Sequence, residues 1–138
     1  MDFNFVESDS TDFDSETYIQ ILIAIAKADK DNGPKEFEYV RKKAQHLGVD
    51  YERFLATTEK TFDLSKQRVS RLTALAVLKD AIMIASMDRN FSLPEREKVY
   101  AFAGKLDISR NDVDYLERCL NEYRALYEKW DRLVAGNH

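Results

Sequence analysis

An internal repeat constrains the fold of this chain more than any other feature of its sequence. Laying the sequence on itself with an offset of 59 residues and no gap aligns the stretches 29–38 (DKDNGPKEFE) and 88–97 (DRNFSLPERE). The alignment pairs acidic residues, namely Asp29, Glu36 and Glu38 with Asp88, Glu95 and Glu97, and apolar residues, namely Ile23, Val40, Ala44 and Leu47 with Ile82, Val99, Ala103 and Leu106. Two amphipathic helices can align their apolar residues by chance because they share a period. An ungapped alignment that also matches three acidic residues is less easily explained by chance. The sequence therefore predicts two related helical halves, packed about a pseudo-twofold axis.

The scarcity of turn residues favours helices throughout. Four glycines and two prolines in 138 residues are too few for an all-β chain. We therefore expect an all-α fold, a compact bundle of about six to seven helices in a single domain over residues 15–138. Its repeat halves span about 15–60 and 70–125, and an acidic leader, residues 1–14, precedes it.

Apolar spacing and capping residues place the individual helices. We expect helices over about 15–28, 34–47, 50–60, 65 or 70 to 87, 93–106 and 110–135, with a connector at Phe62 and Leu64. The fourth is strongly apolar but carries Lys79 and Asp80, which argue against a membrane span because charges at mid-bilayer are costly. We expect both charges to reach the surface, and Arg41, Lys42 and Lys43 to lie on the outer side of the second helix.

The last helix carries a heptad-like apolar pattern. Spacings of 3 and 4 alternate along Val113, Leu116, Leu120, Tyr123, Tyr127, Trp130 and Val134. Leu126 and Leu133 widen this stripe, which favours packing inside one domain. A homodimer formed through this helix is the alternative.

The same residues carry a family resemblance over roughly residues 15 to 125. The first half reads Ala26-Lys27-Ala28-Asp29, then Glu36, then Ala44 to Leu47-Gly48, and the second half reads Ala85-Ser86-Met87-Asp88, Glu95, and Ala103 to Leu106 with Asp107 where glycine is usual. This pattern resembles the TerB-like family, small all-helical domains named for bacterial tellurite-resistance proteins and also found in membrane-anchored J-domain proteins. The resemblance implies a link to tellurite or stress response, protein partners that can be membrane-associated, and paired acids that bind a metal or a basic partner.

The candidate site is the duplicated set of acids. Carboxylates suit hard cations such as Ca2+ and Mg2+, and we hypothesise two equivalent half-sites, Asp29 with Glu36 and Asp88 with Glu95. The secondary candidates are Asp31, Glu38, Asn90 and Glu97. The EF-hand pattern fails on counting, and Lys30 and Arg89 stand beside the aspartates where the family often has glycine, supplying counter-ions. The alternative is structural, with Glu36 and Glu95 acting as caps of the helices that follow them.

Other functional classes are disfavoured by charge and composition. A net charge of −4 argues against a nucleic-acid partner, since that binding depends on neutralising phosphates. The residues Cys119, His46 and His138 form no recognisable catalytic pattern, so we expect no enzyme. One cysteine, no signal peptide and no transmembrane segment predict a cytoplasmic protein. The predicted function is thus a non-catalytic module that binds a cation or a protein partner; the alternatives are a purely structural interaction domain and a small enzyme.

Overall fold

The computed structural model describes residues 12–28, 33–59, 61–86 and 91–137. In this part of the chain every regular element is helical, which confirms the all-α fold. The elements are α1 (Ser15–Ala28), α2 (Pro34–Leu47), α3 (Tyr51–Thr57), the short 3-10 helix η1 (Leu64–Lys66), α4 (Arg71–Ala85), α5 (Leu93–Lys105) and α6 (Arg110–Ala135).

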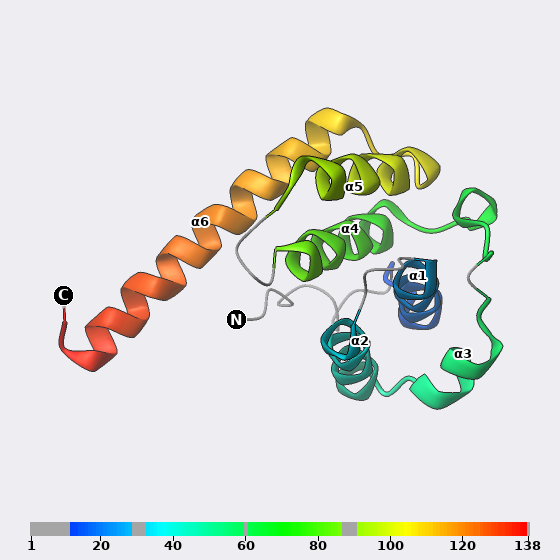
Figure 1. Cartoon of the computed structure of the whole chain (residues 1–138), viewed down its shortest axis with the longest axis horizontal. Helices are drawn as coiled ribbons and strands as arrows, with labels where there is room; N and C mark the ends of the chain where they lie inside the picture. Colours follow the sequence, from blue (N-terminus) through cyan, green and yellow to red (C-terminus); the bar gives the residue numbers. More distant parts are fainter. Residues whose placement is uncertain (1–11, 29–32, 60, 87–90, 138) are drawn as a thin grey trace.

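Two strongly apolar helices, α1 and α4, lie side by side at the centre of the molecule (Figure 1). Helices α2 and α3 pack against α1, whereas α5 and α6 pack against α4. The central helices supply most of the large buried side chains, among them Tyr18, Ile19, Ile21, Leu22, Ile23, Val77, Leu78 and Ile82. These two helices therefore form the core of the bundle.

Local capping explains where the helices begin and end. Asp50, Ser70, Ser92 and Ser109 each accept a hydrogen bond from the backbone N–H three residues later, as N-caps do. Gly48 (φ 71°) and Gly136 (φ 77°) end α2 and α6 in the left-handed conformation that glycine adopts without strain. Helix α3 ends at Thr57, earlier than predicted, because the backbone of Thr58 is extended.

The repeat extends to the element boundaries. The offset of 59 residues takes the start of α2 to the start of α5, and the start of α3 to the start of α6. It also takes Gly48 to Asp107, the described non-glycine residue with a positive φ (61°), in a conformation that aspartate tolerates better than most residues. Helix α3 ends at Thr57, the equivalent of Leu116, but α6 continues to Ala135. The second half of α6 is thus an addition to the repeated unit, while the pseudo-twofold axis stays a prediction.

The chain directly before α1 contacts the start of α4. The backbone carbonyl of Asp12 accepts a hydrogen bond from the Ser70 hydroxyl (2.5 Å), and the N–H of Asp14 donates to Thr73 Oγ1 (3.1 Å). Between them, the ring of Phe13 lies 5.0 Å from that of Tyr18. These contacts fix the entry of the chain into the core.

Three charged residues predicted at the surface are buried, so those predictions are wrong. The exposed fractions of Lys43, Lys79 and Asp80 are 3%, 4% and 0%. Helix α4 packs against α1, α5 and α6, and all residues from 76 to 83 are buried, so the middle of the helix has no solvent-facing side through which two charges could leave.

The apolar stripe of α6 is divided between two environments. Val113 and Leu120 are buried, as predicted. Every residue from 125 to 137 is exposed, so the prediction that Tyr127, Trp130 and Val134 pack inside the domain is wrong. The cause is length, because 26 residues of α6 span about 39 Å whereas the 13 residues of α5 beside it span about 20 Å. Figure 1 shows α6 running past the end of the bundle.

Candidate functional site

The two glutamates of the predicted half-sites, Glu36 and Glu95, lie in the described residues and act as helix caps. Glu36 Oε2 accepts a hydrogen bond from the backbone N–H of Gly33 at 2.7 Å. Glu95 Oε1 accepts from the backbone N–H of Ser92 at 3.3 Å and from its hydroxyl at 2.8 Å. These contacts confirm the capping alternative for both glutamates.

The other half of that site lies outside the described residues. It consists of Asp29, Asp31, Asp88 and Asn90. The pairing of Asp29 with Glu36 and of Asp88 with Glu95 therefore stays a prediction. Within residues 12–28, 33–59, 61–86 and 91–137, no three His, Cys, Asp or Glu side chains gather closely enough to hold a metal ion.

The secondary acids in the described residues have basic partners. Glu38 accepts hydrogen bonds from Arg41, one of them from Nε at 2.8 Å, and this contact lowers the pKa of Glu38. Glu97 Oε1 lies 3.4 Å from Arg110 Nη2, and both of these side chains are largely exposed. A cation that bound either glutamate would have to compete with an arginine of the same chain.

A buried polar cluster joins α1, α2 and α4, and the sequence reasoning missed it. The hydroxyls of Tyr18 and Tyr39 donate to the two carboxylate oxygens of Asp80. The ammonium groups of Lys79 and Lys43 lie 3.4 and 3.8 Å from Asp80 Oδ1. The signal in the sequence was the pair Lys79-Asp80 in the middle of an apolar helix, which is unusual unless partners are supplied from elsewhere in the fold.

The cluster is built to hold helices together. A buried carboxylate is tolerated when cations and hydrogen-bond donors replace the water that it loses, and Asp80 has both. Because Asp80 is 0% exposed, a substrate has no direct access to its oxygens. The geometry therefore favours a structural role in which one carboxylate links three helices.

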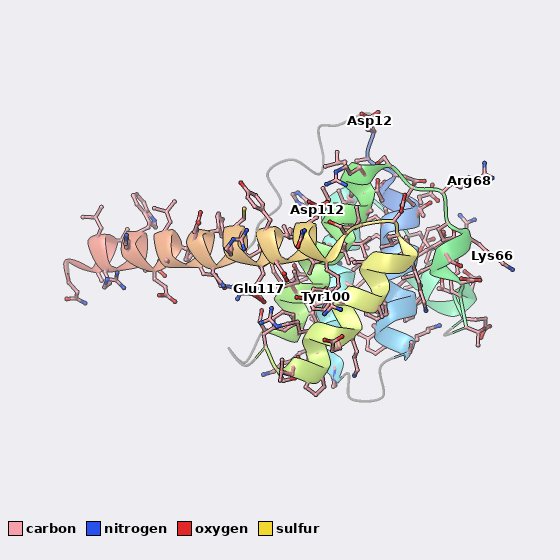
Figure 2. All side chains as sticks on the ribbon, turned by 90° about the horizontal axis from the view of Figure 1, so that it is seen from above. Asp12, Lys66, Arg68, Tyr100, Asp112 and Glu117 are labelled. Carbon is pink, nitrogen blue, oxygen red and sulfur yellow. The ribbon has the colours of Figure 1, made fainter. Side chains whose placement is uncertain are left out.

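The exposed apolar side chains gather on α6. Seven large apolar side chains are exposed in the described residues, and five of them lie within residues 126–134. Those five are Leu126 (65%), Tyr127 (41%), Trp130 (60%), Leu133 (51%) and Val134 (68%). Together with the half-buried Tyr123 they form what we call the apolar seam, and residues 123–135 are the projecting half of α6. Figure 2 shows this part of the helix extending well beyond the body.

Polar contacts fix the other half of α6 to the body. Arg96 Nη1 lies 2.5 Å from Glu117 Oε2, and Arg71 Nη2 lies 2.8 Å from Asp112 Oδ2. Figure 2 labels Tyr100, Asp112 and Glu117 near this junction of α5 and α6. The side-chain hydrogen bond from Arg71 is the largest of the causes that lower the pKa of Asp112.

Further contacts of the same kind continue to the point where α6 leaves the body. The Tyr100 hydroxyl donates to Asp114, which raises the pKa of Tyr100. Arg124 Nη2 donates to Ser86 Oγ at 2.6 Å, at the C-terminal end of α4. The body therefore sets the direction in which the projecting half points.

Comparisons with protein-family models, with curated proteins and with solved structures found no match to this chain. The resemblance to the TerB-like family thus stays a prediction. In the described ranges, each helix is too short or too polar to cross a membrane.

Proposed function

We propose that this chain is a non-catalytic protein-interaction module that binds through the projecting half of α6. The observation that carries the proposal is the apolar seam, five of whose side chains are between 41% and 68% exposed. Single exposed apolar residues are ordinary, but a contiguous patch marks a binding surface. The aromatic composition of the seam fits this function, because Tyr and Trp are enriched where proteins bind one another.

The environments of the other reactive groups support a non-catalytic role. Asp80 is enclosed by two tyrosines and two lysines, and a general acid or base must reach its substrate. Cys119 is only partly exposed and lies on the half of α6 that packs against the body.

Binding of a cation by the duplicated acids is less well supported than binding of a protein. The described glutamates, Glu36 and Glu95, already accept hydrogen bonds that cap α2 and α5. A link to tellurite or stress response rests on the family resemblance alone.

Photocrosslinking at the seam tests the proposal. A benzoylphenylalanine residue would replace Trp130 in one variant and Lys129, an exposed residue outside the seam, in a matched control. In cells that express the chain, we expect a covalent protein adduct from position 130 and much less from position 129. Equal yields at the two positions, or no adduct at either, would contradict the proposal.

A further inference from the structure

We infer that the projecting half of α6 binds the same segment of a second copy in antiparallel orientation, with Tyr127 of each copy facing Trp130 of the other. This inference rests on the proposed function, because it names the partner that covers the apolar seam. It is carried by the order of apolar and charged residues along residues 123–135.

The heptad positions define which residues meet. In the 3 and 4 spacing of the seam, Tyr127 and Val134 take the a positions, and Tyr123 and Trp130 take the d positions. In an antiparallel pair, each a residue faces a d residue of the partner helix. Four layers follow: Tyr123 with Val134, Tyr127 with Trp130, and the same two pairs again by symmetry.

Charge complementarity selects this register. The e positions flank the layers, and in an antiparallel pair they meet one another. The e residues here are Glu117, Arg124 and Asp131. In the inferred register Arg124 of each copy lies beside Asp131 of the other, so two opposite charges meet at both ends of the interface.

The neighbouring registers place like charges together. Moving one helix by a heptad in one direction brings Arg124 against Arg124 and Glu117 against Asp131. Moving it the other way brings Asp131 against Asp131 and leaves fewer layers. Like charges brought together in this way oppose association.

The body of the molecule also favours the inferred register. The first of the alternatives needs Leu116 and Leu120 to face the partner, but Leu120 is 1% exposed and Leu116 packs against the core. The inferred register begins at Tyr123, just where α6 leaves the bundle. It therefore uses the exposed part of the stripe without unpacking the buried part.

The g positions, on the other side of the a and d layers from the e positions, distinguish antiparallel from parallel pairing. The g positions of the projecting half are Leu126 and Leu133, which are 65% and 51% exposed. In the antiparallel pair these two leucines meet across the interface and bury one another. In a parallel pair Leu126 would instead face Asp131, which would desolvate a carboxylate without a partner.

Two short helical segments make a small interface. Residues 123–134 span about 18 Å, so the contact area falls below the roughly 800 Å² per partner of a standard stable complex. We therefore expect a weak, reversible dimer that forms at micromolar or higher concentration.

Sedimentation of the full chain from about 5 to 500 µM, with charge reversals, tests the inference. Asp131→Arg and Arg124→Asp should each weaken dimerisation about tenfold, because each places like charges together, and the double variant should return to within about threefold of the parent. The matched controls are Glu122→Arg and Arg132→Asp, exposed residues outside the seam, which should leave dimerisation unchanged. Since Arg124 also contacts Ser86, circular dichroism should show that each variant is folded.

The outcomes separate this inference from the proposed function. A parent chain that stays monomeric at every concentration overturns self-association, and a crosslink from position 130 to a protein of another mass would still support the interaction function. If the parent chain dimerises but the double variant does not recover that dimerisation, the antiparallel register is wrong. Dimerisation that the control reversals weaken as much as Asp131→Arg overturns the role of the seam.

Discussion

The body of the molecule and the projecting half of α6 depart in opposite ways from the usual distribution of polar and apolar residues. Among the described residues, the body buries three charged side chains, Lys43, Lys79 and Asp80, whereas the projecting half leaves five large apolar side chains exposed. In the body both ammonium groups lie within 4 Å of Asp80 Oδ1, and the tyrosine hydroxyls donate hydrogen bonds to the same carboxylate. On the projecting half, the described residues of the chain leave the seam uncovered.

Under the proposed function, the two regions differ in where their interaction partners come from. Buried charges are tolerated because the fold itself supplies their partners. Exposed aromatic and aliphatic side chains bury little area in the fold, so under the proposed function further burial comes from another molecule. In the proposed function, the body finds its partners within its own chain, whereas a second molecule covers the projecting half.

The largest contrast is expected between two aspartates. Asp80→Ala should lower the free energy of unfolding by about 3–5 kcal/mol, because it leaves two buried ammonium groups without their carboxylate. Asp131→Ala, on the exposed projecting half, should change it by less than about 0.5 kcal/mol. Urea unfolding followed by circular dichroism at about 1 µM chain, below the expected dimerisation range, measures both. Equal losses of unfolding free energy in Asp80→Ala and Asp131→Ala would contradict the distinction between the body and the projecting half.

A second contrast compares leucines on the two halves of α6. Leu120→Ala should destabilise the fold by about 2–5 kcal/mol, because Leu120 is 1% exposed and its truncation leaves a cavity. Leu133→Ala should be nearly neutral for the monomer, since Leu133 is 51% exposed. The same urea titration at low protein concentration measures the change in the free energy of unfolding for both variants. A large loss for Leu133→Ala would mean that the projecting half packs on its own body in solution.

The two ends of α6 provide a third, smaller contrast. Ser109→Ala should cost about 1 kcal/mol, because Ser109 Oγ accepts from the N–H of Asp112 where the helix starts on the body. Gly136→Ala introduces strain at a residue with φ 77°, but that strain falls at the far end of an exposed helix. We expect Gly136→Ala to fray the end locally without changing global stability. Comparing hydrogen exchange along α6 with global unfolding separates the two effects.

The smallest effect concerns acid sensitivity at the base of α6. The Arg71 guanidinium and the Ser109 hydroxyl hold the pKa of Asp112 below its usual 3.8. The folded chain then binds fewer protons at Asp112 than the unfolded chain, so this carboxylate stabilises the fold above pH 3.8 and loses its contribution as the pH falls through its folded pKa. Asp112→Asn should therefore flatten the decline of stability below about pH 4, and Arg71→Gln should do so in part. Melting temperatures measured from pH 5 down to about pH 2.5 check this; curves parallel to that of the parent would contradict it.

The helices were predictable from sequence because their signals are local. Ser92 and Glu95 lie three residues apart and cap α5 through contacts within one turn. The same holds for Gly48, whose left-handed conformation ends α2. Signals of this kind place helix boundaries without knowledge of the tertiary fold.

The features that were missed depend on distant parts of the chain. The hydroxyls that bind Asp80 come from positions 62 and 41 residues away, so no local pattern reveals them. The spacing of the α6 stripe identified its apolar face correctly, but the number of residues that pack is set by the length of the bundle beside it. In the predicted acidic site, the structure shows Glu36 and Glu95 as helix caps, the alternative that the sequence had also offered. Asp29 and Asp88 lie outside the described residues.

The fluorescence of Trp130 tests most directly whether the projecting half is a surface that a second copy covers. Trp130 is the sole tryptophan of the chain and is 60% exposed on the seam. As the concentration rises from about 1 to 500 µM, its emission maximum should move to shorter wavelength in the parent chain, because Tyr127 of the partner would exclude water from the indole. The spectrum of Asp131→Arg should shift much less over the same range. A parent spectrum that keeps the emission of a water-exposed tryptophan at every concentration would contradict the account.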